Sequence, residues 1–170
     1  MNRYGLALSG GGFRATLYHL GVVRCLRDAG VLSKITHITT VSGGSILGAH
    51  LVSNWDRYSG TPEEFDEAAA EIIRFVQLDV RNRIVRRFPL AAAGNKVRSM
   101  LLLGQRRQWT RAGLLERYYE RFLFGDTPLS QLPDHPRLHI LSTNLSEGCL
   151  CSFNRNGLLM QRRVAGRRDR

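Results

Sequence analysis

The 170-residue sequence has few lysines, few cysteines and no long hydrophobic stretch. No apolar run approaches the ~20 residues that a membrane-spanning helix needs. The apolar stretch that precedes Ser9 is too short for a secretory signal peptide. We therefore expect a soluble chain from a reducing compartment, cytoplasmic or peripherally associated with a membrane.

Three cysteines, Cys25, Cys149 and Cys151, form an odd set without the spacing of a disulfide scaffold. Cys149 and Cys151 would share one face of a strand, but no second pair accompanies them, so we predict no zinc site and no other cofactor. The chain is 43% hydrophobic and 23% charged, which is ordinary for a globular protein with one core. We predict a single domain over residues 1–170.

Basic charge is abundant and unevenly placed. Only Lys34 and Lys96 are lysines among 25 basic residues, and the formal net charge is +11. Residues 74–121 hold 12 basic and 3 acidic residues, whereas residues 1–73 hold 6 and 7. A localised basic segment fits an anionic membrane surface or nucleic acid, and equally a solvated face. No recognition-helix, zinc or RNA-binding motif supports nucleic acid, so we expect none.

Two glycine-rich turns follow two predicted strands. Residues 4–8 and 35–41 have strand character, and a helix is predicted between them, ending near Gly30. Strand, helix and strand within about 40 residues imply parallel strands joined by a right-handed crossover. Turns that follow parallel strands open at the same sheet edge, so both turns are expected to face one site.

The remaining elements are predicted from periodicity and capping. The first helix is expected to bury the face that carries Tyr18, Val22, Cys25, Leu26 and Ala29. Thr61-Pro62-Glu63-Glu64 predicts a helix start, because Thr caps and Glu follows three residues later. A helix over residues 110–124, with Leu115, Tyr118, Tyr119 and Phe122 inward, and strands over 138–143 and 149–153 complete the prediction.

The second turn, Thr40-Val41-Ser42-Gly43-Gly44, follows the pattern of a nucleophile elbow. At a sharp strand-to-helix turn a serine hydroxyl is pushed out of the sheet, and small neighbours relieve the crowding. Thr40 stands where the pattern has its first glycine. The alternative is that Ser42 only caps the next helix.

The first turn, Gly10-Gly11-Gly12, leaves backbone N–H groups bare at a helix start, which suits an oxyanion. Gly10, Gly12 and Ala15 also satisfy the G-x-G-x-x-A dinucleotide fingerprint. That function requires an acidic residue at the end of the second strand, where Ser42 stands instead. A serine and an oxyanion loop on adjacent turns supply two of the three parts of an acyl-transfer site.

The strings ALSGGGFRA (7–15), HLGVVRCL (19–26), THITTVSGGSILGAHL (36–51) and LHILSTNLSEG (138–148) resemble bacterial patatin-like phospholipases. The resemblance implies a parallel-sheet, three-layer α/β fold, incomplete here at its C-terminus. It implies lipid ester hydrolysis by a Ser–Asp dyad. By position, Ser42 matches the nucleophile, and Gly10, Gly11 and Gly12 match the oxyanion loop. Arg14, Gly43 and Gly44 match supporting positions.

The dyad Asp of that family precedes Gly, and no Asp of this sequence is followed by Gly. We therefore expect a chain truncated before the segment that carries the base. A Ser–Asp–His triad remains open, since Asp79 or Asp134 with His135 or His139 has the required chain order. His19 and His37 are predicted to be packed or surface residues. A non-catalytic basic module remains the other alternative, and the lipid, its positional specificity and the oligomeric state stay undetermined.

Overall fold

The computed structural model describes residues 3–78, 80, 83, 89 and 110–161. The chain divides into two compact units. The first joins Met1–Ala69 with Thr127–Arg170, and the second is Ala70–Asp126. Most of the basic segment 74–121, and the arginine-rich end after residue 161, lie outside the described residues.

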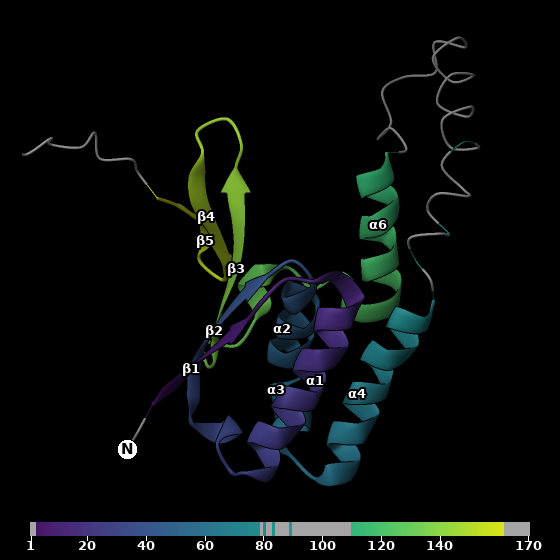
Figure 1. The fold of residues 1–170 in the computed structure, drawn as a ribbon, viewed down its shortest axis with the longest axis vertical. Coiled ribbons are helices and arrows are strands. Elements are labelled where there is room, and N and C mark those ends of the chain that lie inside the picture. Colours follow the sequence, from purple (N-terminus) through teal and green to yellow (C-terminus); the bar gives the residue numbers. More distant parts are fainter. Residues whose placement is uncertain (1–2, 79, 81–82, 84–88, 90–109, 162–170) are drawn as a thin grey trace, which may run out of the picture. The chain divides into compact units, whose positions relative to one another are not determined.

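The first unit is built on a five-stranded sheet in the order β1-β2-β3-β4-β5 (Figure 1). The strands are β1 (Tyr4–Leu8), β2 (Ile35–Val41), β3 (Arg137–Asn144), β4 (Cys149–Asn154) and β5 (Gly157–Met160). β1, β2 and β3 run parallel, and β3, β4 and β5 form an antiparallel meander. The α/β class is confirmed. The sequence analysis did not predict β5, a four-residue strand whose residues are all exposed.

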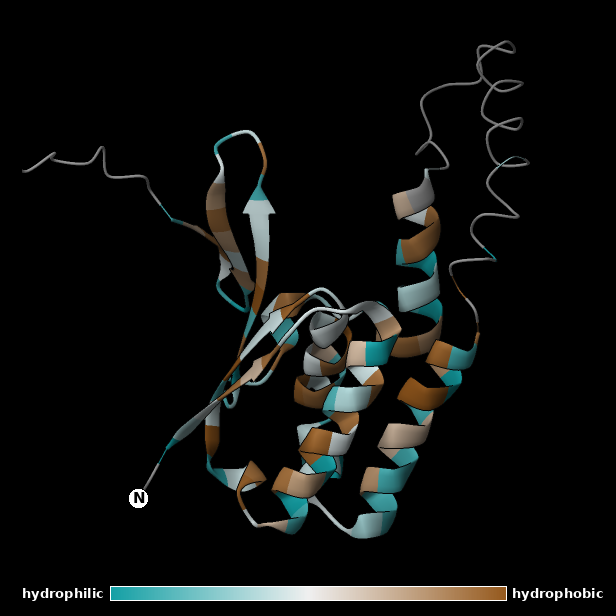
Figure 2. Cartoon of the chain, in the orientation of Figure 1, coloured by the Kyte–Doolittle hydropathy of each residue, from teal (hydrophilic) through white to brown (hydrophobic). Residues whose placement is uncertain are grey.

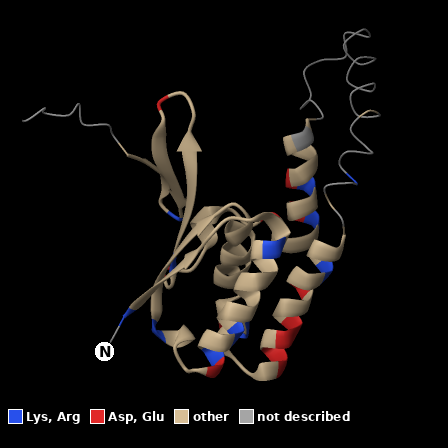
Figure 3. Cartoon of the chain, viewed as in Figure 1, with Lys and Arg blue, Asp and Glu red and all other residues tan. Residues whose placement is uncertain are grey.

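One helix lies between β1 and β2, and three more follow β2. They are α1 (Gly12–Asp28), α2 (Gly43–Ser53), α3 (Trp55–Ser59) and α4 (Pro62–Gln77), with a 3-10 turn η1 (Leu32–Lys34) before β2. The predicted start of α4 is confirmed as a capping box. The Thr61 N–H donates to Glu64 Oε2 at 2.8 Å, and the Glu64 N–H donates to Thr61 Oγ1 at 3.2 Å. Acidic residues gather in this first turn (Figure 3), where their negative charge interacts favourably with the positive end of the helix dipole and stabilises the helix.

The core of the first unit lies between one face of the sheet and the helices. Leu8, Ile38 and Leu47 are at most 2% exposed. The predicted inward face of α1 is wrong, because Tyr18 is 71% exposed and Cys25 is also exposed. α1 instead buries Thr16, His19, Leu20 and Val23. The meander carries hydrophobic residues (Figure 2), and Leu158, Leu159 and Met160 among them are exposed.

The second unit contains the C-terminal part of α4, then α6 (Arg111–Tyr119) and a π-helical turn η2 (Glu120–Phe124). The helix predicted over 110–124 is therefore present with a π turn at its end. Tyr118 is inward as predicted, but Phe122 is 41% exposed and Leu114 takes an inward place instead. The Phe75 and Tyr119 rings lie 5.4 Å apart and hold the helices of this unit together.

Three further observations bear on the expected chemistry. Cys149 and Cys151 are buried on β4 as predicted for one strand face, Cys25 is exposed, and all three are free thiols. In the described part of the chain, no three His, Cys, Asp or Glu side chains group as a metal site would require. No helix among the described residues has the length and apolar character to cross a membrane.

Candidate active site

Ser42 occupies a turn of one residue between two regular elements. β2 ends at Val41, and α2 begins at Gly43. Ser42 has φ 51° and ψ −118°, and among the described residues it is the one non-glycine residue with a positive φ. Such a conformation costs about 1–3 kcal/mol and persists only where the surroundings impose it. The residue is exposed, at the N-terminus of α2.

The residues after Ser42 must be glycines because backbone from the first turn lies against them. A Cβ on Gly43 would lie 2.2 Å from the carbonyl oxygen of Gly12. A Cβ on Gly44 would lie 2.4 Å from the carbonyl oxygen of Leu8. Both separations are far below van der Waals contact. The two glycine-rich turns are therefore in direct contact, as the parallel arrangement of β1 and β2 predicts.

The first turn forms an exposed loop of three glycines beside Ser42. Gly11 and Gly12 have φ values of 144° and 64°, which glycine adopts readily. α1 begins at Gly12, and its first N–H groups have no intrahelical partner. A Cβ on Gly10 would lie 3.4 Å from Ser42 Cβ, so the loop runs alongside the serine. This arrangement offers backbone donors and a helix dipole to negative charge that forms near Ser42.

Two buried polar side chains of α1 bind these turns. Thr16 Oγ1 donates to the Gly43 carbonyl at 2.8 Å and lies 3.3 Å from the Gly12 carbonyl. His19 Nε2 lies 3.1 Å from the carbonyl oxygen and 3.3 Å from the hydroxyl of Ser9. Sequence analysis missed both as site residues. The available signal was their spacing, since Thr16 and His19 lie four and seven residues after Gly12, on one helical face.

The structure brings together six of the seven residues that the sequence singled out: Gly10, Gly11, Gly12, Ser42, Gly43 and Gly44. Arg14 is in the first turn of α1 with its side chain exposed. It forms no ion pair with any residue that the structure describes. Its guanidinium adds positive charge at the same end of α1 as the glycine loop.

Of the triad candidates, Asp134 and His135 lie toward the opposite end of the parallel strands from Ser42, and His139 lies within β3, paired with Thr39. Arg137 is paired with His37 and Leu141 with Val41, so β3 runs four residues, or about 13 Å, before it reaches the level of the Ser42 turn. Asp134 and His135 precede β3 and are farther still. Asp79 lies outside the described residues. Along the described parts of the chain, nothing hydrogen-bonds the Ser42 hydroxyl.

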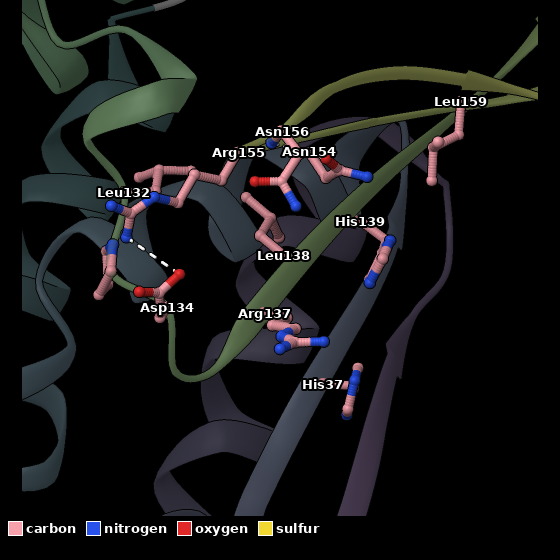
Figure 4. Close-up of a pocket in the computed structure, with 11 residues that line it drawn as sticks. His37, Leu132, Asp134, Arg137, Leu138, His139, Asn154, Arg155, Asn156 and Leu159 are labelled. Carbon is pink, nitrogen blue, oxygen red and sulfur yellow. Dashed lines mark hydrogen bonds and ion pairs between the residues drawn. The ribbon is translucent and has the colours of Figure 1, made fainter.

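Asp134 and His139 face a different hollow (Figure 4). This pocket, of about 330 Å³, is lined by residues of β2, β3, β4 and β5, of the β4–β5 turn and of the segment before β3. Asp134 forms an ion pair with Arg155 at 3.2 Å. His139 Nδ1 lies 3.3 Å from Ser152 Oγ, and the His139 ring stacks on that of His37. These contacts argue against the triad, because they engage its members away from Ser42.

Two solved structures of human GIVD cytosolic phospholipase A2 share the fold. A complex with methyl gamma-linolenyl fluorophosphonate has a TM-score of 0.59 and 20% identity. A complex with that inhibitor and terbium chloride has a TM-score of 0.55 and 22% identity. Each comparison covers 92% of this chain and 23% of the human chain, so this chain spans about a quarter of that length. At these identities the likeness shows the fold alone.

A search of curated proteins finds no match. The family model described as patatin-like phospholipase matches residues 6–163, which include both glycine-rich turns and all five strands except the first two residues of β1. The match extends over nearly the whole chain. The chain therefore belongs to the patatin-like phospholipase family.

Proposed function

We propose that this protein is a serine lipid acyl hydrolase, phospholipase A-like or a more general carboxylic ester hydrolase, with Ser42 as nucleophile. Family membership supports lipid hydrolysis in general. The observation that carries the finer proposal is the positive φ of Ser42 in a one-residue turn beside Gly10. A plain helix cap does not require this backbone, since N-cap residues adopt the extended region.

Acyl transfer follows from this arrangement in two steps. Ser42 Oγ attacks the ester carbonyl, its proton passes to a base, and the alcohol leaves as the carbonyl of the acyl-enzyme re-forms. Water then attacks the acyl-enzyme and releases the carboxylic acid. In both steps the N–H groups of Gly11 and Gly12 would stabilise the oxyanion, with Gly43 and Gly44 allowing the close approach of the turns. One such donor contributes roughly 3 kcal/mol to transition-state stabilisation.

The base is the part of the mechanism that the described residues do not supply. No Asp of the sequence is followed by Gly, as the family's dyad would require. His19 is engaged with Ser9, and Asp134 and His139 lie elsewhere on the sheet. We propose that the base comes from residues outside this 170-residue chain. Arg14 would attract an anionic head group toward the loop.

A fluorophosphonate probe tests the nucleophile. An alkyl fluorophosphonate has an electrophilic phosphorus, so an activated Oγ displaces fluoride and leaves a covalent adduct. In the protein translated from the complete reading frame, we expect one adduct, on the peptide that contains Ser42, and turnover of a short-chain ester. Ser42→Ala should abolish both. Ser33→Ala, a matched change at an exposed serine of η1, should leave both intact. Turnover by Ser42→Ala near the parental rate would overturn the proposal.

The excess of basic residues in segment 74–121 supports an anionic membrane surface as the partner of this protein, and that surface would present the lipid substrate. Each basic residue near such a surface contributes about 1 kcal/mol. Binding to vesicles that contain anionic lipid should weaken steeply with salt, because ions screen the attraction. Equal binding to neutral and anionic vesicles, or binding to neither, would favour a solvated face. Tight nucleic-acid binding without vesicle binding would favour a non-catalytic basic module.

A further inference from the structure

The Thr16 hydroxyl is the buried side-chain group that contacts both glycine-rich turns. Thr16 lies in α1, four residues after Gly12, and is fully buried. Its Oγ1 lies 2.8 Å from the carbonyl oxygen of Gly43 and 3.3 Å from that of Gly12. A threonine in a helix commonly bonds the carbonyl four residues earlier. The shorter bond, to Gly43, crosses 27 residues to another element.

The two carbonyls belong to the peptide groups that frame the candidate site. Gly12 ends the loop whose N–H groups would stabilise the oxyanion, and Gly43 directly follows Ser42. The backbones are already so close that Gly43 has no room for a Cβ beside Gly12. The Thr16 hydroxyl has one proton, which it donates to the Gly43 carbonyl at 2.8 Å, while its oxygen also lies 3.3 Å from the Gly12 carbonyl. It therefore joins the start of α2 to the start of α1, where the two glycine-rich turns end.

We propose that Thr16 is a positioning residue that fixes the glycine loop relative to Ser42. The proposal rests on the proposed function, since the positioned groups are the nucleophile and the oxyanion donors. Thr16 itself does not touch the reacting atoms. Its hydroxyl sets how far the loop N–H groups lie from the oxygen of the tetrahedral intermediate, and a donor that is displaced stabilises the oxyanion less.

This role differs in its kinetic signature from a merely structural one. Loss of a fold contact lowers the amount of active protein and leaves the properties of the folded fraction unchanged. Displaced oxyanion donors lower kcat with little change in KM, because they act only in the transition state. The hydroxyl can be isolated by two matched pairs, Thr16 against Thr16→Val and Thr16→Ser against Thr16→Ala. Within each pair only the hydroxyl differs appreciably.

The kinetic experiment uses the protein translated from the complete reading frame and a water-soluble ester. We expect Thr16→Val and Thr16→Ala to lower kcat per folded molecule about 10-fold, a fraction of the 10²–10³ that loss of a whole donor causes. KM should stay within about twofold, and Thr16→Ser should keep kcat within about twofold of the parent. Thr36→Val, the same chemical change at the opposite end of β2, should leave kcat unchanged. Active-site titration with the fluorophosphonate counts the folded, competent molecules.

A second measurement keeps the proposal testable without turnover. Amide hydrogen exchange is followed in peptides that cover residues 8–14 and 41–47. Both segments should exchange faster in Thr16→Val and Thr16→Ala, and at the parental rate in Thr16→Ser and Thr36→Val. Unchanged exchange and unchanged kcat in the variants without the hydroxyl would overturn the positioning role. If the parent lacks turnover and labelling at Ser42, the proposed function fails, while the exchange data still decide whether Thr16 joins the two turns.

Discussion

At the scale of single residues, the site is defined by backbone constraints more than by side-chain chemistry. Ser42 has a positive φ, and the residues beside it are glycines because Gly12 and Leu8 leave no space for a Cβ. A strained serine and two close backbone approaches oppose stability. Such destabilising features are expected together at a functional site, where the rest of the fold compensates for the free energy that they cost.

The strain at Ser42 should be measurable as stability. Ser42→Gly removes the Cβ that disfavours φ 51° and ψ −118°, whereas Ser42→Ala keeps it. We therefore expect Ser42→Gly to be about 1 kcal/mol more stable than Ser42→Ala in urea unfolding, with neither reacting with the fluorophosphonate. Ser33→Gly and Ser33→Ala, at an exposed site of ordinary φ, provide the control, with the glycine variant the less stable of the two. Equal or lower stability of Ser42→Gly would show that the turn is not strained.

The contact between the turns gives a second prediction, at Gly43. Its added methyl would meet the Gly12 carbonyl at 2.2 Å, so the backbones must separate. Gly43→Ala should lower the free energy of unfolding by about 3 kcal/mol and abolish labelling at Ser42. Gly21→Ala is the matched control, since Gly21 lies inside α1 with no atom near its added Cβ. That change should raise the free energy of unfolding by about 0.5–1 kcal/mol. Calorimetric measurement of the free energy of unfolding of both variants tests this prediction.

At the scale of elements, sequence reasoning succeeded where local rules decide and failed where tertiary contacts do. The two strands, both turns and the α4 capping box follow from residue type and spacing within a few positions. The inward face of α1 was predicted wrongly because hydrophobicity alone favours Val22 and Leu26. The actual inward face carries Thr16 and His19, whose polar atoms bond backbone groups of the turns. Helical spacing after Gly12 places Thr16 and His19 on one face, but their bonding partners in the turns are distant in sequence, so spacing alone does not show that this face is the buried one.

The capping box of α4 gives a prediction at this scale. Thr61 and Glu64 satisfy each other's backbone N–H groups. Thr61→Ala should lower the free energy of unfolding by about 1 kcal/mol, as loss of an N-cap typically does. Thr61→Ser should retain most of the stability. Glu67→Gln, at an exposed site of α4 beyond its first turn, serves as the control in the same thermal unfolding series. An unchanged melting temperature in Thr61→Ala would mean that the cap does not stabilise α4.

At the scale of the whole molecule, the sheet illustrates what a chain can and cannot reveal about its topology. The parallel pairing of β1 and β2 follows from the crossover rule. The sequence did not place β3 beside β2, where the register sets Leu141 against Val41. The turn to antiparallel pairing after β3 arises from the short link to β4, which allows a hairpin. The sequence of β5, GLLM, lacks the alternation of apolar and polar residues that predicts a strand. The presence of β5 depends on β4 as a template.

The same sheet predicts how the isolated 170-residue chain behaves. Within the described residues, β1 and β5 each have one neighbour, and β5 exposes Leu158, Leu159 and Met160 by about half of their surfaces or more. Unpaired strand edges with apolar side chains favour self-association. Ser42 has no base within hydrogen-bond reach among these residues, and an unassisted serine hydroxyl is a weak nucleophile. We expect negligible ester turnover and elution beyond the monomer in size-exclusion chromatography.

The decisive comparison runs the isolated chain beside its Ser42→Ala variant and a variant with a charged edge, Leu159→Lys. If β5 causes the association, Leu159→Lys should shift elution toward the monomer without creating turnover, because a lysine at an exposed edge opposes strand addition but supplies no base for Ser42. The parent and Ser42→Ala should then show the same residual rate. A monomeric parent with Ser42-dependent turnover would contradict both expectations, and it would require that the base of the reaction is already present in these 170 residues.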